Sequence, residues 1–323
     1  MSSLTRIKRP QKRPAEAARI PERGRGKLGY WLYFIPGAIL ISVVIFYPIV
    51  RNLRLSLYHW RGGRAPEHFT GFDNWFALFH DSAFLQSFTN IALVVIAMVI
   101  VPTLLGLVIA AALFDVVGRR FGGKVSSLLR ATYYLPQILP IAVAGVMFSW
   151  ILKPNRDGVL NQFLSTITGH AVTVNWLGGQ YSTAIASAMV LMIWIQLGYP
   201  VVIFMAALQR VEPELYEASE LDGANWFQRF RAITLPQIRP EVFVVALTTT
   251  IAALKVFGPI FILTMGGPSK STYVPSFYAY QEFIKGPDKG YAAAIASAIT
   301  VVVFVVAVIF IKVQTRSERK DAS

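Results

Sequence analysis

The sequence predicts an all-α, polytopic membrane protein with six transmembrane helices. Hydrophobic residues make up 54% of the 323-residue chain, and charged residues make up only 15%. A typical soluble domain would carry roughly 25% charged residues. Apolar runs of about 20 residues recur along the chain, and each is long enough to cross a bilayer as a helix. Composition and periodic apolar runs therefore agree on the fold class.

The apolar runs define a transmembrane domain at residues 29–312 between two tails. Residues 1–28 are basic and polar, include three prolines, and predict a flexible cytoplasmic tail without the apolar core of a signal peptide. Residues 313–323 predict a second cytoplasmic tail. The expected spans are 29–50, 88–113, 131–152, 182–208, 241–264 and 290–312.

Proline interrupts several of these spans. The prolines inside them are Pro36, Pro102, Pro136, Pro140, Pro200 and Pro259. Each removes a backbone donor, which neighbouring helices can compensate within a membrane. Such breaks suit helices that move or line a path, and they also occur in static bundles.

The distribution of lysine and arginine predicts the orientation. Of the 31 basic residues, 21 fall in loops 114–130 and 209–240 and at the two chain ends, 1–28 and from Lys312 onward, whereas nine fall in the alternate loops. This excess places both termini and loop 209–240 in the cytoplasm. It also accounts for the net charge of +14. Nucleic acid is not an expected partner, because no aromatic residues interleave with the basic ones to grip bases.

Lys255 is the one basic residue that lies within a predicted span and not at its end. A lysine at the centre of a membrane helix costs about 2.5–3.5 kcal/mol on insertion scales. It is therefore expected to have either an escape to the interface, a packing partner, or a place on a translocation path.

The residues do not support an enzyme with its own metal or cofactor. The chain has no cysteine, and its four histidines lack metal-ligand spacing. Two glycine-rich segments, 24–29 and 118–124, resemble phosphate-binding loops, but neither follows a predicted strand. The acidic residues all fall in tails, loops or helix ends, which weakens an ion-coupled mechanism. Energy for any uphill transport is then expected from elsewhere.

Loop 209–240 has ordered local signals that are unusual for a simple connection. Pro213 suits the first turn of a helix, with acidic Glu212 and Glu214 near its positive end. Gly223 is expected to stop this helix in a left-handed conformation. Asn225 is expected to cap a second one.

The second helix of this loop has an expected capping partner, an apolar edge and an end. Gln228 stands at the capping-box position. Phe227, Phe230 and Ile233 give an apolar edge, and Pro236 is expected to end the helix before the fifth span begins after Pro240. The product is a helix-turn-helix knob, which either packs on its own bundle or docks a partner.

The same loop resembles the EAA motif of ABC importer permeases. It reads Glu217-Ala218-Ser219, three residues, Gly223, nine residues, then Ile-Thr-Leu-Pro, with serine in place of the second alanine. Residues 263–268 (LTMGGP), followed by Thr272, and residues 71–75 (GFDNW) resemble the carbohydrate branch of maltose and glycerol-3-phosphate type. The resemblance covers residues 29–312.

The resemblance implies a type I ABC importer permease fold in a bacterial or archaeal cytoplasmic membrane. It implies four partners besides membrane lipid: a second homologous permease, an ATP-binding subunit dimer that holds ATP and Mg, an extracytoplasmic substrate-binding protein, and a sugar, oligosaccharide or glycerol-phosphate-type solute. The permease itself would be non-catalytic. Left open are a non-sugar solute on the same machine and a proton-coupled carrier.

Two sets of site residues follow from the resemblance. The expected ATPase-coupling residues are Glu217, Ala218, Ser219, Asp222, Gly223, Leu235 and Pro236. The candidate translocation path contains Gln196, Leu197, Gly198, Tyr199, Thr249, Ala253, Lys255 and Val256. The fifth-helix face is largely apolar, so specificity is expected to rest mainly in the binding protein.

Overall fold

The computed structural model describes residues 28–114, 122–178 and 181–321, with the side chains of 28–31, 181–182 and 317–321 excepted. The tail before residue 28 and most of both glycine-rich segments lie outside the described residues. The chain divides into two units, Met1–Val50 and Arg51–Ser323. Each is considered by itself.

The described part of the first unit is helical throughout. It holds α1 (Leu28–Ile41), the π-helical turn η1 (Ser42–Phe46) and the start of α2 (Tyr47–Leu55). Residues Leu32–Leu55 form a candidate span of 24 residues, long enough for the hydrocarbon core. Pro36 lies inside α1, and the helix continues past it.

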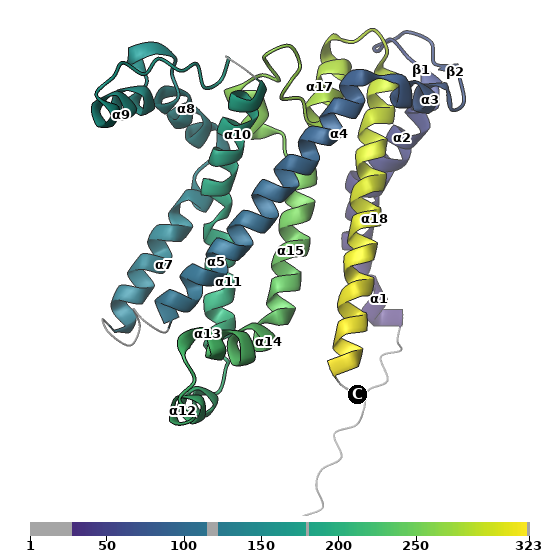
Figure 1. Ribbon diagram of the computed structural model, residues 1–323. Coiled ribbons are helices and arrows are strands. Elements are labelled where there is room, and N and C mark those ends of the chain that lie inside the picture. The colour runs from purple at the N-terminus through teal and green to yellow at the C-terminus, as the bar shows by residue number, and fades with distance from the viewer. Residues whose placement is uncertain (1–27, 115–121, 179–180, 322–323) are drawn as a thin grey trace, which may run out of the picture. The chain divides into compact units, whose positions relative to one another are not determined.

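The second unit is a helical bundle with one small hairpin (Figure 1). The hairpin pairs β1 (Tyr58–His59) with β2 (His68–Phe69). The first helices are α3 (Asp73–His80), α4 (Ser82–Val95), η2 (Ile96–Ile100), α5 (Val101–Ala112), α7 (Gly123–Ile138), α8 (Ile141–Ile151), η4 (Asn155–Asp157) and α9 (Val159–Thr168). The remaining helices are α10 (Tyr181–Gln196), α11 (Gly198–Leu208), α12 (Pro213–Leu221), α13 (Trp226–Arg229), η5 (Phe230–Thr234), α14 (Leu235–Gln237), α15 (Arg239–Leu254), α16 (Gly258–Leu263), α17 (Pro275–Lys285) and α18 (Lys289–Asp321).

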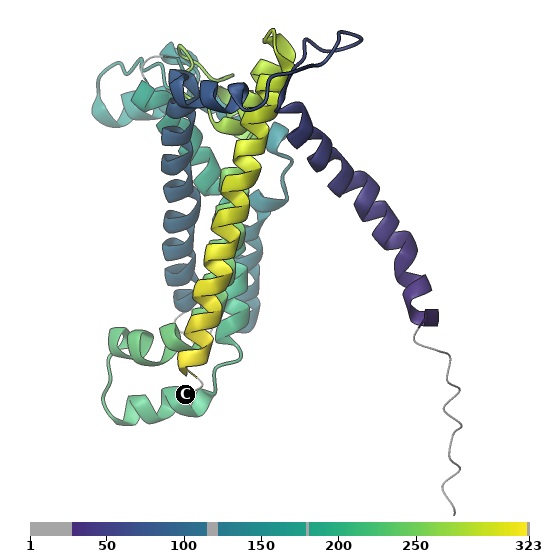
Figure 2. The ribbon, with the colours of Figure 1, turned by 90° about the vertical axis from the view of Figure 1, so that its right-hand side faces the viewer.

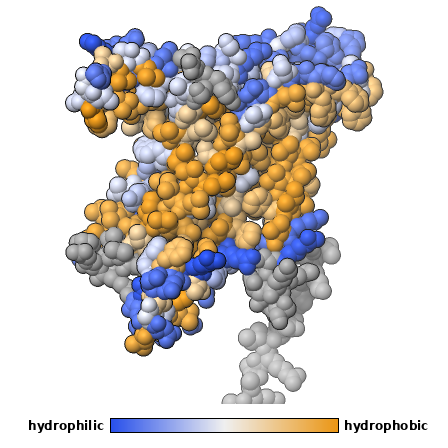
Figure 3. Space-filling view, in the orientation of Figure 1, coloured by the Kyte–Doolittle hydropathy of each residue, from blue (hydrophilic) through white to orange (hydrophobic). Residues whose placement is uncertain are grey.

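Four helical runs of the described chain are long and apolar enough to cross a membrane. They are Leu32–Leu55, Ser82–Ala112, Thr183–Leu208 and Lys289–Arg316. Two bent pairs raise the total to as many as six: α7 with α8, bent by 94°, and the α13–α14 stretch with α15, bent by 69°. An apolar band between polar ends covers the helices of the second unit (Figure 3). The all-α membrane fold is therefore established, with four to six spans.

The third and fifth predicted spans are broken in the structure. Between α7 and α8, Leu139 is extended because it precedes Pro140. The predicted span 241–264 ends at Leu254 and resumes as a separate helix at Gly258. Pro259 explains this second break, since its ring would clash with the carbonyl four residues earlier. The last helix instead runs past residue 312 to Asp321, so 313–321 is helical.

Two apolar clusters hold the long helices together. One joins α4, α10, α15, α16 and α17 around Val94, Leu191, Ile260 and Phe277, all 0% exposed. The other joins α5, α11 and α15 around Phe204, Leu208 and Val245. Many residues on the outside of α18, such as Phe304 at 68% exposed, are also apolar. That combination, apolar inside and outside, is typical of a membrane bundle.

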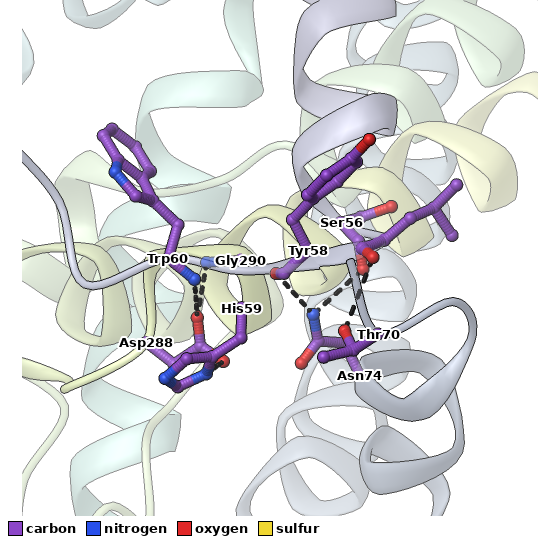
Figure 4. A network of polar contacts seen from close by, with 9 residues as sticks. Ser56, Tyr58, His59, Trp60, Thr70, Asn74, Asp288 and Gly290 are labelled. Atoms are coloured by element: carbon purple, nitrogen blue, oxygen red, sulfur yellow. Dashed lines mark hydrogen bonds and ion pairs between the residues drawn. The ribbon is translucent and has the colours of Figure 1, made fainter. Parts of the chain in front are cut away.

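A polar network fixes the connection before α18 (Figure 4). Asp288 accepts hydrogen bonds from the Trp60 and Gly290 amides at 3.0 and 2.9 Å, and its other oxygen lies 2.6 Å from His59 Nδ1. Asn74 donates to the carbonyls of Ser56 and Tyr58, both at 3.0 Å. The sequence pattern at 71–75 thus serves to fasten the segment after α2 onto α3.

Asp81 holds α4, α17 and α18 together at the same end of the bundle. It caps α4 by accepting from the Ala83 and Phe84 amides at 2.8 and 3.4 Å, and it also accepts from the hydroxyls of Tyr278 and Tyr291. Burial opposes ionisation of this carboxyl, but the four hydrogen bonds outweigh it, and the pKa of Asp81 lies below its usual value.

We expect this carboxylate to make the bundle acid-sensitive. A depressed folded-state pKa contributes stability above the ordinary value near 3.8, and that stability is lost as the pH falls through the folded pKa. Thermal unfolding in detergent should therefore shift to lower temperature as the pH falls from 5 to 2, and Asp81→Asn should flatten this dependence. Burial raises the pKa of nearby Glu282, which acts in the opposite sense. An unchanged pH dependence in the variant would contradict the assignment to Asp81.

Candidate functional site

The connection between α11 and α15 is a helical loop that extends beyond the bundle. In two perpendicular views α12 lies past the ends of α5 and α11, at the opposite end of the second unit from α9 and α17 (Figures 1 and 2). We call residues 212–237 the coupling knob.

The first helix of the knob is bounded as the sequence predicts. Pro213 occupies the first turn of α12 after an extended Glu212. At the other end the Gly223 amide donates to the Glu220 carbonyl at 3.1 Å, and the Ala224 amide donates to the Ser219 carbonyl at 3.0 Å. Gly223 has φ +73°. This pair of bonds around a left-handed glycine is a Schellman cap.

The second helix of the knob begins at the predicted capping box. The Gln228 amide donates to Asn225 Oδ1 at 3.0 Å, and the Asn225 amide donates to Gln228 Oε1 at 2.8 Å. The end of this second helix differs from the prediction. Helical structure continues through Pro236 to Gln237, because the π-turn η5 comes just before and leaves proline in a first-turn position. The α15 helix then begins at Arg239.

Tyr216 fastens α12 to the rest of the knob. Its side chain is 4% exposed, its hydroxyl lies 3.0 Å from Thr234 Oγ1, and its ring packs on Phe114. An ion pair between Arg229 and Glu220 links the two helices on the outside. Sequence reasoning missed Tyr216 and Thr234. The available signal was Tyr216 itself, the one aromatic side chain of α12.

The outer surface of the knob combines apolar and acidic side chains. Leu221 is 90% exposed and Phe227 is 63% exposed. Of the predicted coupling residues, Ser219 is half-buried and bonds to its own helix at Tyr216. The exposed predicted residues are Glu217, Ala218, Asp222, Gly223, Leu235 and Pro236. A rigid, exposed and partly apolar surface of this kind is suited to binding another protein.

Most of the predicted path residues lie inside the bundle. Gln196, Gly198, Thr249, Ala253 and Val256 are buried, whereas Leu197 and Tyr199 are half-buried. Thr249 is 1% exposed and donates to the carbonyl of its own helix at Val245. These residues therefore face the chain's own core in this structure.

The open face of α15 is a neighbouring one. It consists of Val244, Thr248 and Ala252, with Lys255 next in the same stripe, and all four are exposed. Their spacing of four, four and three residues places them on one side of the helix. Tyr199 Oη lies 3.1 Å from Thr248 Oγ1, so α11 contributes to this stripe. The prediction missed Thr248, whose signal was this same spacing.

Lys255 does not lie within a continuous helix. It is the residue at which α15 ends, with φ −103° and ψ 8°, and it is exposed. A cation is favoured at a helix C-terminus, where the last carbonyls are unpaired. Among the described residues no ion pair involves Lys255, and no cluster of three or more His, Asp or Glu residues could hold a metal.

The motif at 263–268 forms a closed turn after α16. Thr264 Oγ1 lies 2.7 Å from Thr272 Oγ1, and Thr272 Oγ1 donates to the Gly267 carbonyl at 2.9 Å. Asn90 from α4 donates to the carbonyls of Ser271 and Tyr273 at 2.7 and 2.8 Å. The pattern that resembles the carbohydrate branch is thus a structural turn that α4 holds in place.

The described chain is a polytopic helical bundle with an ordered helical knob, which is the architecture of a multi-pass membrane protein. Residues 103–320 match the family described as "Binding-protein-dependent transport system inner membrane component", and the chain belongs to this family. The predicted ABC permease, which is not itself an enzyme, is confirmed.

Two curated relatives are similar over nearly their whole lengths. The probable ABC transporter permease protein YurN of Bacillus subtilis is 34% identical over 86% of this chain and 93% of its own length. The lactose transport system permease protein LacF of Rhizobium radiobacter is 30% identical over 90% of this chain and 94% of its own length. Among solved structures, a bacterial ABC transporter involved in import of the acidic polysaccharide alginate matches with a TM-score of 0.77 at 23% identity. The match covers 90% of this chain and 96% of that one. This last likeness shows the fold.

Proposed function

We propose that this chain is one of two permease subunits of an ATP-driven, binding-protein-dependent importer for a sugar-like solute. The coupling knob carries the proposal. It is ordered by two caps and by the Tyr216–Thr234 contact, and it presents exposed Leu221 and Phe227. A rigid element that contacts both an ATPase and the helical bundle can transmit a coupling free energy between them.

The proposed orientation places the coupling knob, both termini and the 114–130 loop in the cytoplasm. The excess of lysine and arginine on these segments supports it. A separate ATPase dimer, which binds ATP and Mg, would supply the energy for transport. The opposite end, with α9 and α17, would meet the substrate-binding protein. A sugar-like solute is supported by the similarity to LacF, whose name describes lactose transport.

The open face of α15 is the proposed boundary of the path. Along the span the exposed residues of α18 are mostly large and apolar, including Val301, Phe304 and Ile309, with Thr300 as a polar exception. The exposed stripe of α15 instead contains Thr248, Ala252 and Lys255. Because polar and charged side chains are costly against lipid, the α15 stripe is better suited to the second permease and the path between the two subunits.

ATP-driven uptake in proteoliposomes tests the proposal. The chain is purified with its partner permease, ATPase and binding protein, and uptake of labelled disaccharide is measured with and without ATP. Vanadate, or an ATP-binding-defective ATPase, should stop uptake. A proton-coupled carrier would instead continue with an inactive ATPase and stop when the proton gradient is collapsed, and that result would overturn the proposal.

Leu221→Asp should release the ATPase from the complex. Fully burying a leucine side chain contributes about 1.5–3 kcal/mol, and a carboxylate left unpaired in an interface adds a further cost. We expect at least about a tenfold loss of ATPase co-purification, since 1.4 kcal/mol corresponds to a factor of ten. Leu221→Met should retain binding. Val159→Asp, an exposed position on α9 at the other end of the unit, is the matched control. If the Leu221→Asp variant co-purifies with as much ATPase as the wild-type protein does, this surface is not the docking site.

A further inference from the structure

Lys255 is an exposed cation at a depth where cations are costly. The α15 helix has 16 residues from Arg239 to Leu254, which corresponds to about 24 Å of axial length. The hydrocarbon core is about 30 Å thick. If Arg239 marks one boundary of the membrane, Lys255 lies inside the opposite one.

Nothing in the described chain neutralises this cation. The four candidate spans contain no aspartate or glutamate, and α15 contains only Glu241, in its first turn at the far end. Glu241 is already ion-paired with Arg210. The C-terminal end of α15 favours the lysine charge, but the exposed ammonium still needs water or an anion. Among the described residues no acidic group supplies that anion, so the ammonium meets water or an anion from elsewhere.

The backbone around Lys255 is irregular. Residues 255–257 are not helical and separate α15 from α16. Irregular backbone at membrane depth is tolerated only where protein buries it or where it borders a water-filled space. The Val256 carbonyl is satisfied by the Ser276 hydroxyl, whereas Lys255 itself is exposed. The break thus presents the lysine at the edge of the bundle.

An aromatic surface lies next to the lysine in sequence. Phe257 is half-buried and stacks on Phe261 with ring centroids 5.2 Å apart. It also meets Tyr280 edge-on at 5.2 Å, and Tyr280 is 37% exposed. Small-molecule sites typically combine aromatic surface with a few placed polar or charged groups. The Tyr199–Thr248 hydroxyl pair belongs to the same open stripe.

We propose that Lys255 selects for solutes that carry an anionic group, such as a carboxylate, sulfonate or phosphate on a sugar-like molecule. This inference rests on the proposed function, because it assumes that solute passes along the α15 stripe. The ammonium pairs transiently with the anionic group, and the exposed hydroxyls and aromatic edge contact the rest of the solute. A neutral sugar gains nothing from the charge.

The test compares two disaccharides that differ only in charge. ATP-driven uptake of a labelled glucuronic-acid disaccharide and of its neutral glucose counterpart is measured in proteoliposomes with the whole complex. We expect Lys255→Gln to lower uptake of the acidic disaccharide at least about tenfold, equivalent to 1.4 kcal/mol, while uptake of the neutral one changes less than twofold. Lys255→Arg should restore the acidic substrate. Lys285→Gln is the matched control, because Lys285 also ends a helix, α17, and is exposed.

Other sources of the counter-charge predict different results. If an acidic residue of the second permease pairs with Lys255, Lys255→Glu will reduce co-purification of that subunit, and both disaccharides will be affected equally. If the headgroup of an anionic lipid pairs with Lys255, replacing anionic by zwitterionic lipid will lower uptake of both disaccharides, and Lys255→Gln will lower both as well. Either pattern overturns the inference, as does a wild-type complex that carries only the neutral disaccharide. Absence of ATP-driven uptake for both disaccharides would instead contradict the proposed function.

Discussion

Gly223→Val is expected to abolish coupled transport while the subunit still assembles in the membrane. Gly223 has φ +73°, and a side chain added at this position would meet nothing within 4 Å. The penalty is therefore purely conformational. A left-handed residue with a Cβ costs roughly 1–2 kcal/mol, and a β-branched residue is a more severe outlier. Because the cap controls the turn between α12 and α13, relief of this strain would move α12 on its support.

The size of the effect should follow backbone preference and not side-chain volume. Asparagine tolerates the left-handed region, so Gly223→Asn should keep near-wild-type uptake although its side chain is as large as that of valine. Gly223→Ala should be intermediate. We expect ATP-driven uptake to fall at least about tenfold in Gly223→Val, equivalent to 1.4 kcal/mol or more, with ATP hydrolysis no longer stimulated by substrate.

The outcome of this series separates conformation from contact. If Asn and Val at position 223 are equally damaging, the partner touches the glycine directly and the φ argument is wrong. If both variants import normally with full substrate stimulation, the geometry of the coupling knob does not matter for transport. Protein yield and co-purification of the second permease serve as controls for folding.

Local signals explain why the coupling knob could be predicted so closely. The caps at Gly223 and Asn225 depend on residues within six positions of each other, and sequence shows such spacing directly. The contact between Tyr216 and Thr234 spans 18 positions. It depends on how α12 folds back, which the pattern of apolar residues does not specify. Similarly, Pro236 looked like a helix end because the π-turn before it has no sequence signature.

The path residues show where periodicity stops being informative. The α15 helix is apolar on most sides, so its sequence does not distinguish the face buried in its own bundle from the exposed face. The structure distinguishes them, because Thr249 and Ala253 are buried while Thr248 and Ala252, one residue earlier in each case, are exposed. A one-residue step turns the helix by about 100°. Tertiary packing alone settled that choice.

Gly198 was predicted to line the path, and the structure gives it a packing role with a large expected effect. A Cβ at this position would lie 2.4 Å from the Tyr133 carbonyl oxygen and 2.7 Å from the Tyr134 Cα. Both obstacles are backbone atoms of α7, which cannot rotate away as a side chain could. The glycine therefore allows α7 and α11 to approach each other closely, as small residues do between membrane helices.

Gly198→Ala should destabilise the bundle although alanine is the better helix former. Overpacking typically costs about 1–3 kcal/mol, occasionally more. For a protein of this size that corresponds to a fall of roughly 2–10 °C in the unfolding temperature. Gly123→Ala, in the first turn of α7 with nothing within 4 Å of its Cβ position, should be neutral or slightly stabilising. Thermal unfolding of the purified complex in detergent measures both. If Gly198→Ala retains wild-type stability but changes the solute preference of uptake, the residue lines the path after all, and α7 and α11 separate during transport.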